Sequence, residues 1–231
     1  MTFTGWKSGW KSRTPPDPVS DVTPELLVRA YASGVFPMAD TAASTEIYWV
    51  DPTERGIVPL DGFHISRSLA KAIRREDYSV RINSDFALTL EHCADRPETW
   101  INGEIFQLYC ALYDMGLAHS LEVWRDDKMI GGVYGVTLGG AFFGESMFSK
   151  ATNGSKIALS YLVHRLRTGG FSLFDTQFIT SHLQSLGAIE IPREAYHQQL
   201  AEALRIRADF TAPVTPDAGR LLADLKPKYY G

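Results

Sequence analysis

Hydrophobic residues recur with a helical period along several stretches of this 231-residue chain. Thr23 is a favourable N-cap, Pro24 suits the first position of a helix, and Gly34 suits a helix end. We therefore predict a helix between Thr23 and Gly34. The same period predicts further helices over 64–75, 88–93, 103–115, 155–167, 181–186 and 193–205.

Alternation of hydrophobic and polar residues predicts strands elsewhere, beginning with 78–83. From His119 the chain holds three extended runs, separated by Asp126–Asp127 and Gly139–Gly140. Both pairs are typical of hairpin turns, so we predict a three-stranded meander. Further short extended segments are predicted around 47–50, 56–60, 171–178 and 188–191.

Length and composition indicate a globular protein with one large domain, or with a small domain leaning on a larger one. Apolar residues make up 45% of the chain and charged residues 22%, which is ordinary for such proteins. Residues 1–20 are rich in Gly, Ser, Lys and Pro, and we interpret them as a mobile tail. The segment from Pro213 is again rich in proline and charge and is interpreted as a second tail.

The net charge of −4 argues against a protein that coats nucleic acid, although it permits a local basic patch. Cys93 and Cys110 have no metal-ligand spacing, and we expect buried free thiols rather than a disulfide. Residues 1–18 lack the apolar run of a secretory signal, and no stretch reaches the ~18 apolar residues that span a bilayer. We therefore expect a cytoplasmic protein without a membrane partner.

The strongest local pattern is Asp175-Thr176-Gln177 at the end of a predicted strand. Residues two apart in a strand face the same side, so Asp175 and Gln177 project together. An acid beside an amide there is costly unless both are hydrogen-bonded or a ligand approaches. The pair is therefore a candidate site, and the alternative is a structural polar pair that caps the next helix.

Glu145 closes the third strand of the meander among aromatic and methionine side chains. A carboxylate in apolar surroundings either finds a partner or binds something cationic or polar. The alternative is a solvent-facing strand position.

The run Asn153-Gly154-Ser155-Lys156 precedes a predicted helix. Free N–H groups at a helix start favour an anion, and Lys156 adds positive charge. The alternative is an ordinary N-cap followed by a solvated lysine. The glycine pairs of the meander do not form a phosphate loop, because no Gly-Lys-Ser/Thr follows them.

Arg67, Lys71, Arg74 and Arg75 share one face of the predicted helix over 64–75. Such a face is usually only solvated, and it becomes a candidate phosphate contact if RNA is a partner. Aromatic side chains can stack on bases of single-stranded nucleic acid, but more often they belong to a core.

Many of these segments together resemble one family, the leucyl/phenylalanyl-tRNA–protein transferases. The resemblance is carried by LLVRAYASGVFPM, YWVDP, HISRSL, TWI, GLAHSLEVWRDDKMIGGVYGVTLGGAFFGESMFS, NGSKIAL and FDTQFITSHLQSLGAIEIPR, which follow one another in the family's order. It covers roughly residues 24–200. Gly154 departs from the alanine that the family often has there.

The resemblance implies a small N-terminal domain and a larger C-terminal one. Together with the tail over 1–20, we therefore expect an α+β protein with a small α/β domain over 21–83 and a larger domain over 84–231. The larger domain would have an acetyltransferase-like (GNAT-like) mixed sheet flanked by helices. The implied activity moves Leu or Phe, with some tolerance of Met, from aminoacyl-tRNA to the N-terminal Arg or Lys of acceptor proteins, which marks them for degradation. No metal or coenzyme is implied, and we expect a monomer.

The resemblance also assigns roles to residues. Asp175, Gln177 and Glu145 would be catalytic. Phe142, Met147, Leu159 and Phe174 would line the amino-acid pocket. Trp49 and Trp100 would lie near the terminal adenosine of the tRNA. The candidate tRNA contacts come instead from the local concentration of positive charge, now that tRNA is the implied partner: Arg67, Lys71, Arg74, Arg75 and Lys156.

In the implied reaction, the donor ester is already activated, so the enzyme mainly holds both substrates in attack geometry. Gln177 would accept a hydrogen bond from the attacking amine, and Asp175 would orient and polarise the Gln177 amide. Glu145 would bind the amino group of the donor amino acid or a ribose hydroxyl. Whether Gln177 relays a proton or only positions the amine stays open. We expect Asp175→Ala to reduce transfer while leaving the fold intact.

Two other classes compete with this interpretation. A small-molecule N-acetyltransferase needs a glycine-spaced pyrophosphate loop before its central helix, and Asn153-Gly154-Ser155-Lys156 is a poor version of one. A noncatalytic tRNA-binding module leaves the Asp175–Gln177 pair without an explanation.

Overall fold

A computed structural model describes residues 22–38, 48–97 and 99–226. Its main feature is a seven-stranded sheet in the order β4-β5-β6-β7-β8-β3-β9. Every neighbouring pair is antiparallel except β7 and β8, which are parallel. The strands of this sheet are β3 (Glu54–Ile57), β4 (Ser79–Ile82), β5 (Ala118–Arg125), β6 (Lys128–Leu138), β7 (Ala141–Ser149), β8 (Leu173–Gln177) and β9 (Ile189–Pro192). A separate two-stranded sheet pairs β1 (Phe36–Met38) with β2 (Tyr48–Val50).

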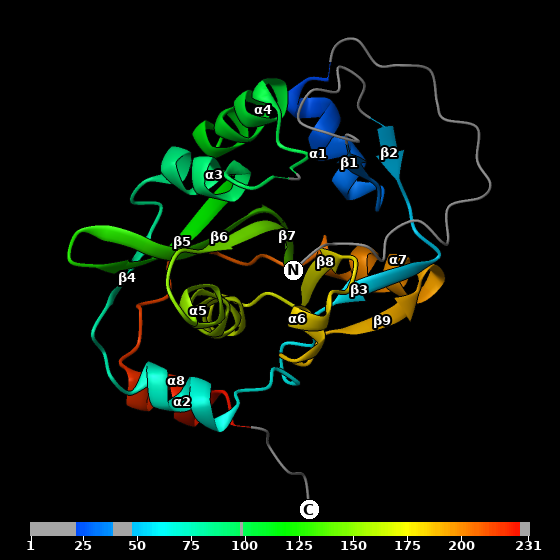
Figure 1. Cartoon of the computed structure of the whole chain (residues 1–231). Coiled ribbons are helices and arrows are strands. Elements are labelled where there is room, and N and C mark those ends of the chain that lie inside the picture. The colour runs from blue at the N-terminus through cyan, green and yellow to red at the C-terminus, as the bar shows by residue number, and fades with distance from the viewer. Residues whose placement is uncertain (1–21, 39–47, 98, 227–231) are drawn as a thin grey trace, which may run out of the picture.

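Helices cover both faces of the large sheet (Figure 1). On one face lie α1 (Pro24–Ala32), α3 (Phe86–Ala94) and α4 (Gly103–Asp114), which share a hydrophobic core with Tyr134 and Phe143 of the sheet. On the other lie α5 (Gly154–Thr168), α2 (Arg67–Ile73) and α8 (Ala218–Asp224), which form a second core with Phe142 and Phe174. The remaining helices are α6 (Ser181–Gln184) and α7 (Arg193–Ala203).

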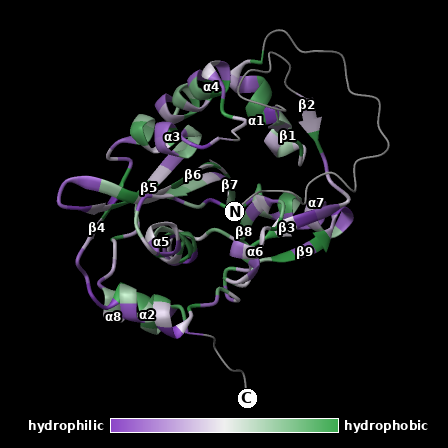
Figure 2. Cartoon of the chain, in the orientation of Figure 1, coloured by the Kyte–Doolittle hydropathy of each residue, from purple (hydrophilic) through white to green (hydrophobic). Residues whose placement is uncertain are grey.

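The meander is confirmed as β5, β6 and β7. Asp126 and Asp127 both have positive φ, at 48° and 56°, as a tight hairpin turn requires. This turn is hydrophilic in Figure 2, and both of its aspartates are exposed. The predicted start of the first helix is confirmed too, since Thr23 accepts a hydrogen bond from the Leu26 N–H and Pro24 is its first residue.

The C-terminal segment is the clearest error of the sequence interpretation. We expected a tail from Pro213, but residues 218–224 form α8 against α5. Asp217 caps the helix by accepting from the Arg220 N–H, and Leu221 is fully buried beneath it. Proline and charge around a short helix hid the hydrophobic residues that anchor it.

The helix predicted over 64–75 is shorter than expected. Ser66 caps α2 by accepting from the Leu69 N–H, so the helix begins at Arg67. It ends at Ile73 with Arg74 as its C-cap, and Glu76 then has φ of 47°. Arg75 therefore lies beyond the helix rather than on its face.

Strands from both ranges that we expected to form separate domains belong to one sheet. β3 and β4 come from 21–83, and they pair with β8, β9 and β5 from 84–231. No helix among the described residues is long and apolar enough to cross a membrane.

Candidate active site

The site lies where the parallel strands β7 and β8 diverge. Their pairing runs from Ala141–Leu173 to Phe143–Asp175 and then stops, although β7 continues to Ser149. At the same place β7 carries a bulge: Tyr134 pairs with Ser146 and Gly135 with Gly144, so Glu145 has no partner in β6. Bulges often lie next to active sites because they redirect a side chain. Here the bulge points Glu145 into the core formed with α1 and α4.

Asp175 is held in a buried ion pair that the sequence did not predict. Both carboxylate oxygens accept from Arg55, with Nε–Oδ1 at 2.9 Å and Nη2–Oδ2 at 2.6 Å, and both side chains are at most 1% exposed. Tyr196 donates a further hydrogen bond to Oδ2 at 2.8 Å. The guanidinium lies between the rings of Phe36 and Tyr196, at 4.6 and 4.3 Å from their centroids.

This ion pair favours the charged form of Arg55. Burial disfavours the charged guanidinium, but the Asp175 carboxylate raises the pKa of Arg55 above its ordinary value. Removing one partner of such a pair leaves an uncompensated buried charge. Asp175 is therefore part of the protein's internal structure, and our expectation that Asp175→Ala leaves the fold intact does not agree with this geometry.

Gln177 is fixed in a strained turn by the same carboxylate. Its backbone N–H donates to Asp175 Oδ1 at 2.8 Å, its φ is 57°, and the Phe178 N–H donates to the Thr176 carbonyl at 2.6 Å. These features define a γ-turn with positive φ, which is rare and strained. Gly56 makes room for it, because a Cβ there would meet the Phe178 carbonyl carbon at 2.7 Å. Asp175 thus contacts the backbone of Gln177, where we had expected it to orient the side-chain amide.

The side-chain amide of Gln177 fits between the diverging strands. With its nitrogen toward the strands, it donates to the carbonyls of Gly144 at 2.8 Å and Thr176 at 3.0 Å. The opposite orientation gives one long hydrogen bond of 3.4 Å to Glu145 Oε1. The first orientation satisfies more of the hydrogen-bonding capacity, and it turns the carbonyl oxygen of Gln177 toward Glu145.

Glu145 is linked to a chain of tyrosine hydroxyls. Tyr109 of α4 donates to Glu145 Oε2 at 2.6 Å, and the hydroxyls of Tyr31 and Tyr109 are 2.7 Å apart. Burial raises the pKa of Glu145 to about 7, while the hydroxyls of Tyr109 and Tyr31 lower it. Burial, followed by the Glu145 charge, also raises the pKa of both tyrosines well above the ordinary value, so they remain hydrogen-bond donors. Glu145 can therefore gain or lose a proton near neutral pH.

The four predicted pocket residues come together, but on the other face of the sheet. Phe142, Leu159 and Phe174 are at most 1% exposed in the second core, and Met147 packs against the same core. The rings of Phe142 and Phe174 are 5.5 Å apart. The divergence of β7 and β8 lies between this cluster and Glu145.

The two predicted tryptophans differ in their relation to the site. Trp100 lies against Tyr109, with ring centroids 6.2 Å apart, and so adjoins the hydrogen-bonded chain that reaches Glu145. Trp49 is half-buried in β2, where it pairs with Pro37 and packs against the first core.

The basic residues proposed for tRNA have different surroundings. Arg67, Lys71, Arg74 and Arg75 are all exposed, on or just after α2. Lys156 is half-buried in the first turn of α5. Two N–H groups that we expected to be open there are already bonded, Gly154 to the Ala151 carbonyl and Ser155 to Ser149 Oγ. Asn153 is not an ordinary N-cap, since its φ is 68° and its side chain makes no capping bond.

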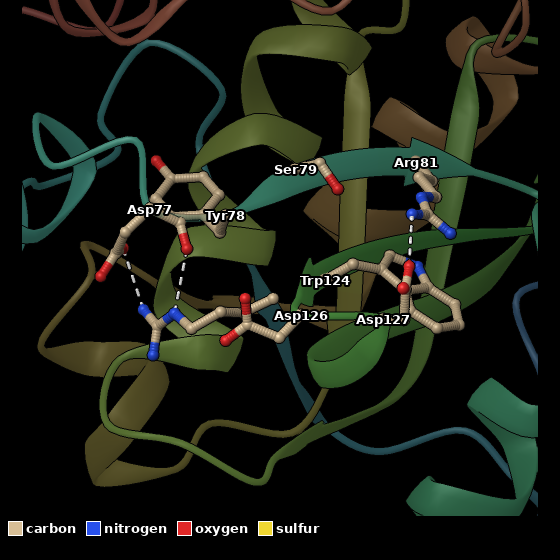
Figure 3. A pocket seen from close by; sticks show the side chains of 8 residues that line it. Asp77, Tyr78, Ser79, Arg81, Trp124, Asp126 and Asp127 are labelled. Carbon is tan, nitrogen blue, oxygen red and sulfur yellow. Dashed lines mark hydrogen bonds and ion pairs between the residues drawn. The ribbon is translucent and has the colours of Figure 1, made fainter.

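A cleft of about 320 Å³ opens elsewhere, at the edge formed by β4 and β5. Figure 3 shows its lining, where Arg125 bonds Asp77 and Arg81 faces Asp127. None of the predicted site residues lines it, and β6 lies between its strands and those of the site. Among the described residues, no group of three or more His, Cys, Asp or Glu side chains is placed to hold a metal ion.

Four residues of the site were missed by the sequence interpretation: Arg55, Tyr31, Tyr109 and Tyr196. We interpreted Tyr31 and Tyr109 only as inward positions of their helices. Buried tyrosine hydroxyls need partners, so two inward tyrosines were a usable signal of a polar cluster. Arg55 gave no local signal, because its partner lies 120 residues away.

Comparisons with known proteins agree with this arrangement of motifs. A family model described as leucyl/phenylalanyl-tRNA protein transferase matches residues 57–201, and the model of that family's N-terminal domain matches residues 20–53. A leucyl/phenylalanyl-tRNA–protein transferase of Cereibacter sphaeroides is 63% identical over 197 residues, which cover 85% of this chain and 92% of that one. A relative with the same description from a Ruegeria species is 62% identical over 198 residues, covering 86% and 94%.

Likeness to solved structures is weaker. A crystal structure of FemX covers 74% of this chain and 69% of its own, with a TM-score of 0.47 and 12% identity, which is too low to support an argument. The sequence matches are decisive by themselves, because two relatives above 60% identity and two family models together span most of the chain. This protein belongs to the leucyl/phenylalanyl-tRNA–protein transferase family.

Proposed function

We propose that this protein transfers leucine or phenylalanine from aminoacyl-tRNA to the N-terminal Arg or Lys of acceptor proteins, which marks them for degradation. Family membership over most of the chain carries this proposal. The reaction forms a peptide bond and releases the free 3′ end of the tRNA. It takes place in the cytoplasm, where charged tRNA is found.

The geometry around Glu145 and Gln177 supports catalysis rather than binding alone. A strained turn, a carboxylate with raised pKa and a strand bulge coincide at the divergence of β7 and β8. Strain and perturbed pKa values cluster at functional sites. Gln177 accepts a hydrogen bond from the attacking amine, and Asp175 acts by fixing the backbone of Gln177.

The donor amino acid enters the apolar cluster around Met147 and passes between the diverging strands. Phe142, Leu159 and Phe174 form the walls. Such a pocket discriminates one methylene by only ~10–200-fold, so Leu, Phe and some Met are all accepted. Trp49 and Trp100 receive the terminal adenosine, since aromatic rings stack on unpaired bases.

The acceptor stem of the tRNA contacts the basic side chains of Arg67, Lys71, Arg74 and Arg75, and Lys156 lies closer to the 3′ end. Their exposure supports this assignment, because phosphate contacts need free cations at the surface. The sheet is of the acetyltransferase-like kind, which the parallel but diverging β7 and β8 support. The functional unit is a monomer.

The deciding experiment measures transfer of labelled Leu from Leu-tRNA to a peptide that begins with Arg. A matched peptide that begins with Gly serves as the acceptor control, and acetyl-coenzyme A replaces the donor in a second control. Transfer to the Arg peptide alone, and from the charged tRNA alone, is the expected result. Acetylation from acetyl-coenzyme A without aminoacyl transfer would instead support the N-acetyltransferase class.

A further inference from the structure

The site holds two carboxylates: Asp175 is fully buried and Glu145 is half-buried, and only Asp175 is neutralised by an ion pair. Asp175 forms a bidentate ion pair with Arg55. Within the described part of the chain, no lysine, arginine or histidine forms an ion pair with Glu145. Its partner is the Tyr109 hydroxyl, which is neutral. Glu145 is therefore the carboxylate whose charge is free to change during a reaction.

The titratable groups that are electrostatically coupled to Glu145 come from five elements. They are Tyr109 of α4, Tyr31 of α1, Tyr134 of β6, Asp175 of β8 and Arg55 of β3. The three tyrosines stay protonated, and the charges of Asp175 and Arg55 are engaged with each other. No other group of this set is placed to exchange a proton near neutral pH.

The facing atoms of Gln177 and Glu145 require a hydrogen between them. When the Gln177 nitrogen bonds Gly144 and Thr176, its carbonyl oxygen takes the position that is 3.4 Å from Glu145 Oε1. Two acceptor oxygens repel each other unless a donor hydrogen lies between them. That hydrogen comes from a protonated Glu145 or from an N–H group of a bound substrate. The site can therefore hold a protonated Glu145, or an ionised Glu145 with a substrate N–H group between the two oxygens.

We propose that Glu145 takes the proton released by the attacking α-amine and returns it to the departing ribose oxygen of the tRNA. This inference rests on the proposed function. The neutral amine, aimed by the Gln177 oxygen, attacks the ester carbon and forms the C–N bond. The nitrogen then loses a proton to the Glu145 carboxylate. As the C–O ester bond breaks, the ribose oxygen takes that proton, which leaves a free hydroxyl and an ionised Glu145.

The other side chains of the site are unsuited to this step. An amide such as that of Gln177 is a very weak base. Both Asp175 oxygens already accept hydrogen bonds, from Arg55, Tyr196 and the Gln177 N–H, and are occupied by them. Asp175 is therefore a positioning residue, and Glu145 is the catalytic base and acid.

The test is a pH profile of single-turnover transfer of Leu from Leu-tRNA to an Arg-initiated peptide, with both substrates saturating. The wild-type rate should rise with pH through about 7 as Glu145 ionises, and the α-amine adds its own step near pH 7.7–8.0. Glu145→Gln should lower the rate by about 10²–10⁴-fold and should remove the step near 7. Added formate should partly rescue Glu145→Ala, in which space for it exists, and should not rescue Glu145→Gln.

The pH profile of Tyr109→Phe is an independent test. If Glu145 had only a structural role, this substitution would leave the pH dependence of the rate unchanged. The Tyr109 hydrogen bond lowers the pKa of Glu145, so its loss should raise that pKa and shift the lower limb of the profile to higher pH. The proton role is overturned if Glu145→Gln keeps the wild-type rate and profile, or if only its KM for Leu-tRNA rises. Thermal unfolding of each variant separates these results from loss of the fold. A wild-type protein that transfers no Leu would refute the proposed function instead.

Discussion

Replacing Asp175 by Asn tests whether the buried ion pair holds the site together. The substitution keeps the side-chain shape but removes the negative charge, so the Arg55 guanidinium, 1% exposed, loses its counterion. Breaking a buried pair from one side costs about 3–5 kcal/mol, because the remaining charge stays buried. For a protein of this size, that corresponds to a fall in Tm of roughly 6–20 °C.

A second Asp–Arg pair in the same chain is a matched control. Asp77 and Arg125 are 2.9 Å apart, much like Asp175 and Arg55, but their side chains are 46% and 36% exposed. Exposed pairs contribute only ~0–1 kcal/mol. Asp77→Asn should therefore lower Tm by no more than a few degrees, roughly 2–4 °C.

Unfolding by urea and by heat, with circular dichroism as the signal, measures both variants. Equal losses for Asp175→Asn and Asp77→Asn would refute the reasoning, since burial would then not determine the cost. A destabilised Asp175→Asn protein that still transfers Leu at the wild-type rate below its Tm would show that the fold needs this carboxylate but the reaction does not.

Four further outcomes are expected. The Gln177→Gly variant should be more stable than Gln177→Ala by about 1–2 kcal/mol. Both variants lack the amide, but only alanine keeps the backbone strain of φ 57°. Equal urea midpoints of the two variants would contradict this. Burial lowers the pKa of His119 to about 4, so the unfolded chain takes up a proton there at higher pH than the folded protein does. The contribution of neutral His119 to the free energy of unfolding, of the order of 3 kcal/mol, is therefore complete above pH 6.5 and is lost as pH falls from 6.5 toward 4. His119→Gln should flatten that part of the stability profile, and an unchanged slope would count against the assignment. Arg74→Ala with Arg75→Ala should weaken tRNA binding and reduce its salt dependence but spare transfer from a short aminoacyl-adenosine; equal loss with both donors would mean that the basic face supports the fold. Met147→Trp should disfavour Phe-tRNA more than Leu-tRNA in competition by filling the pocket, and an unchanged ratio would place Met147 outside it.

Local patterns predicted most of the regular elements, because caps, periodicity and turn residues act over a few positions. The Thr23 cap, the Asp126–Asp127 turn and the strand that ends in Gln177 are examples. The order of strands was not accessible in this way. β3 lies between β8 and β9, which come more than 100 residues later, and no short-range pattern encodes that pairing.

The candidate site was predicted in part for the same reason. Asp175 and Gln177 are two residues apart, so their proximity follows from the sequence, but the positive φ of Gln177 departs from the strand geometry that we used to predict it. The bulge at Glu145 shifts the register by one residue, and nothing in Gly144-Glu145-Ser146 distinguishes a bulge from a regular strand. The ion pair to Arg55 joins two distant segments, and therefore the backbone role of Asp175 emerged only from the structure.

The position of β3 in the sheet has a consequence for how the chain is made on the ribosome. Residues Glu54–Ile57 leave the ribosome long before their neighbours, β8 and β9, have been synthesised. Until then β3 has no strand to pair with, and the charge of Arg55 remains in water. Pairing of β3 with β8 needs the chain as far as residue 177, pairing with β9 needs residue 192, and the covering of Arg55 by Tyr196 needs four residues more. Non-local pairing of this kind slows folding, and a nascent chain that stalls earlier would expose two unpaired strand edges to other chains.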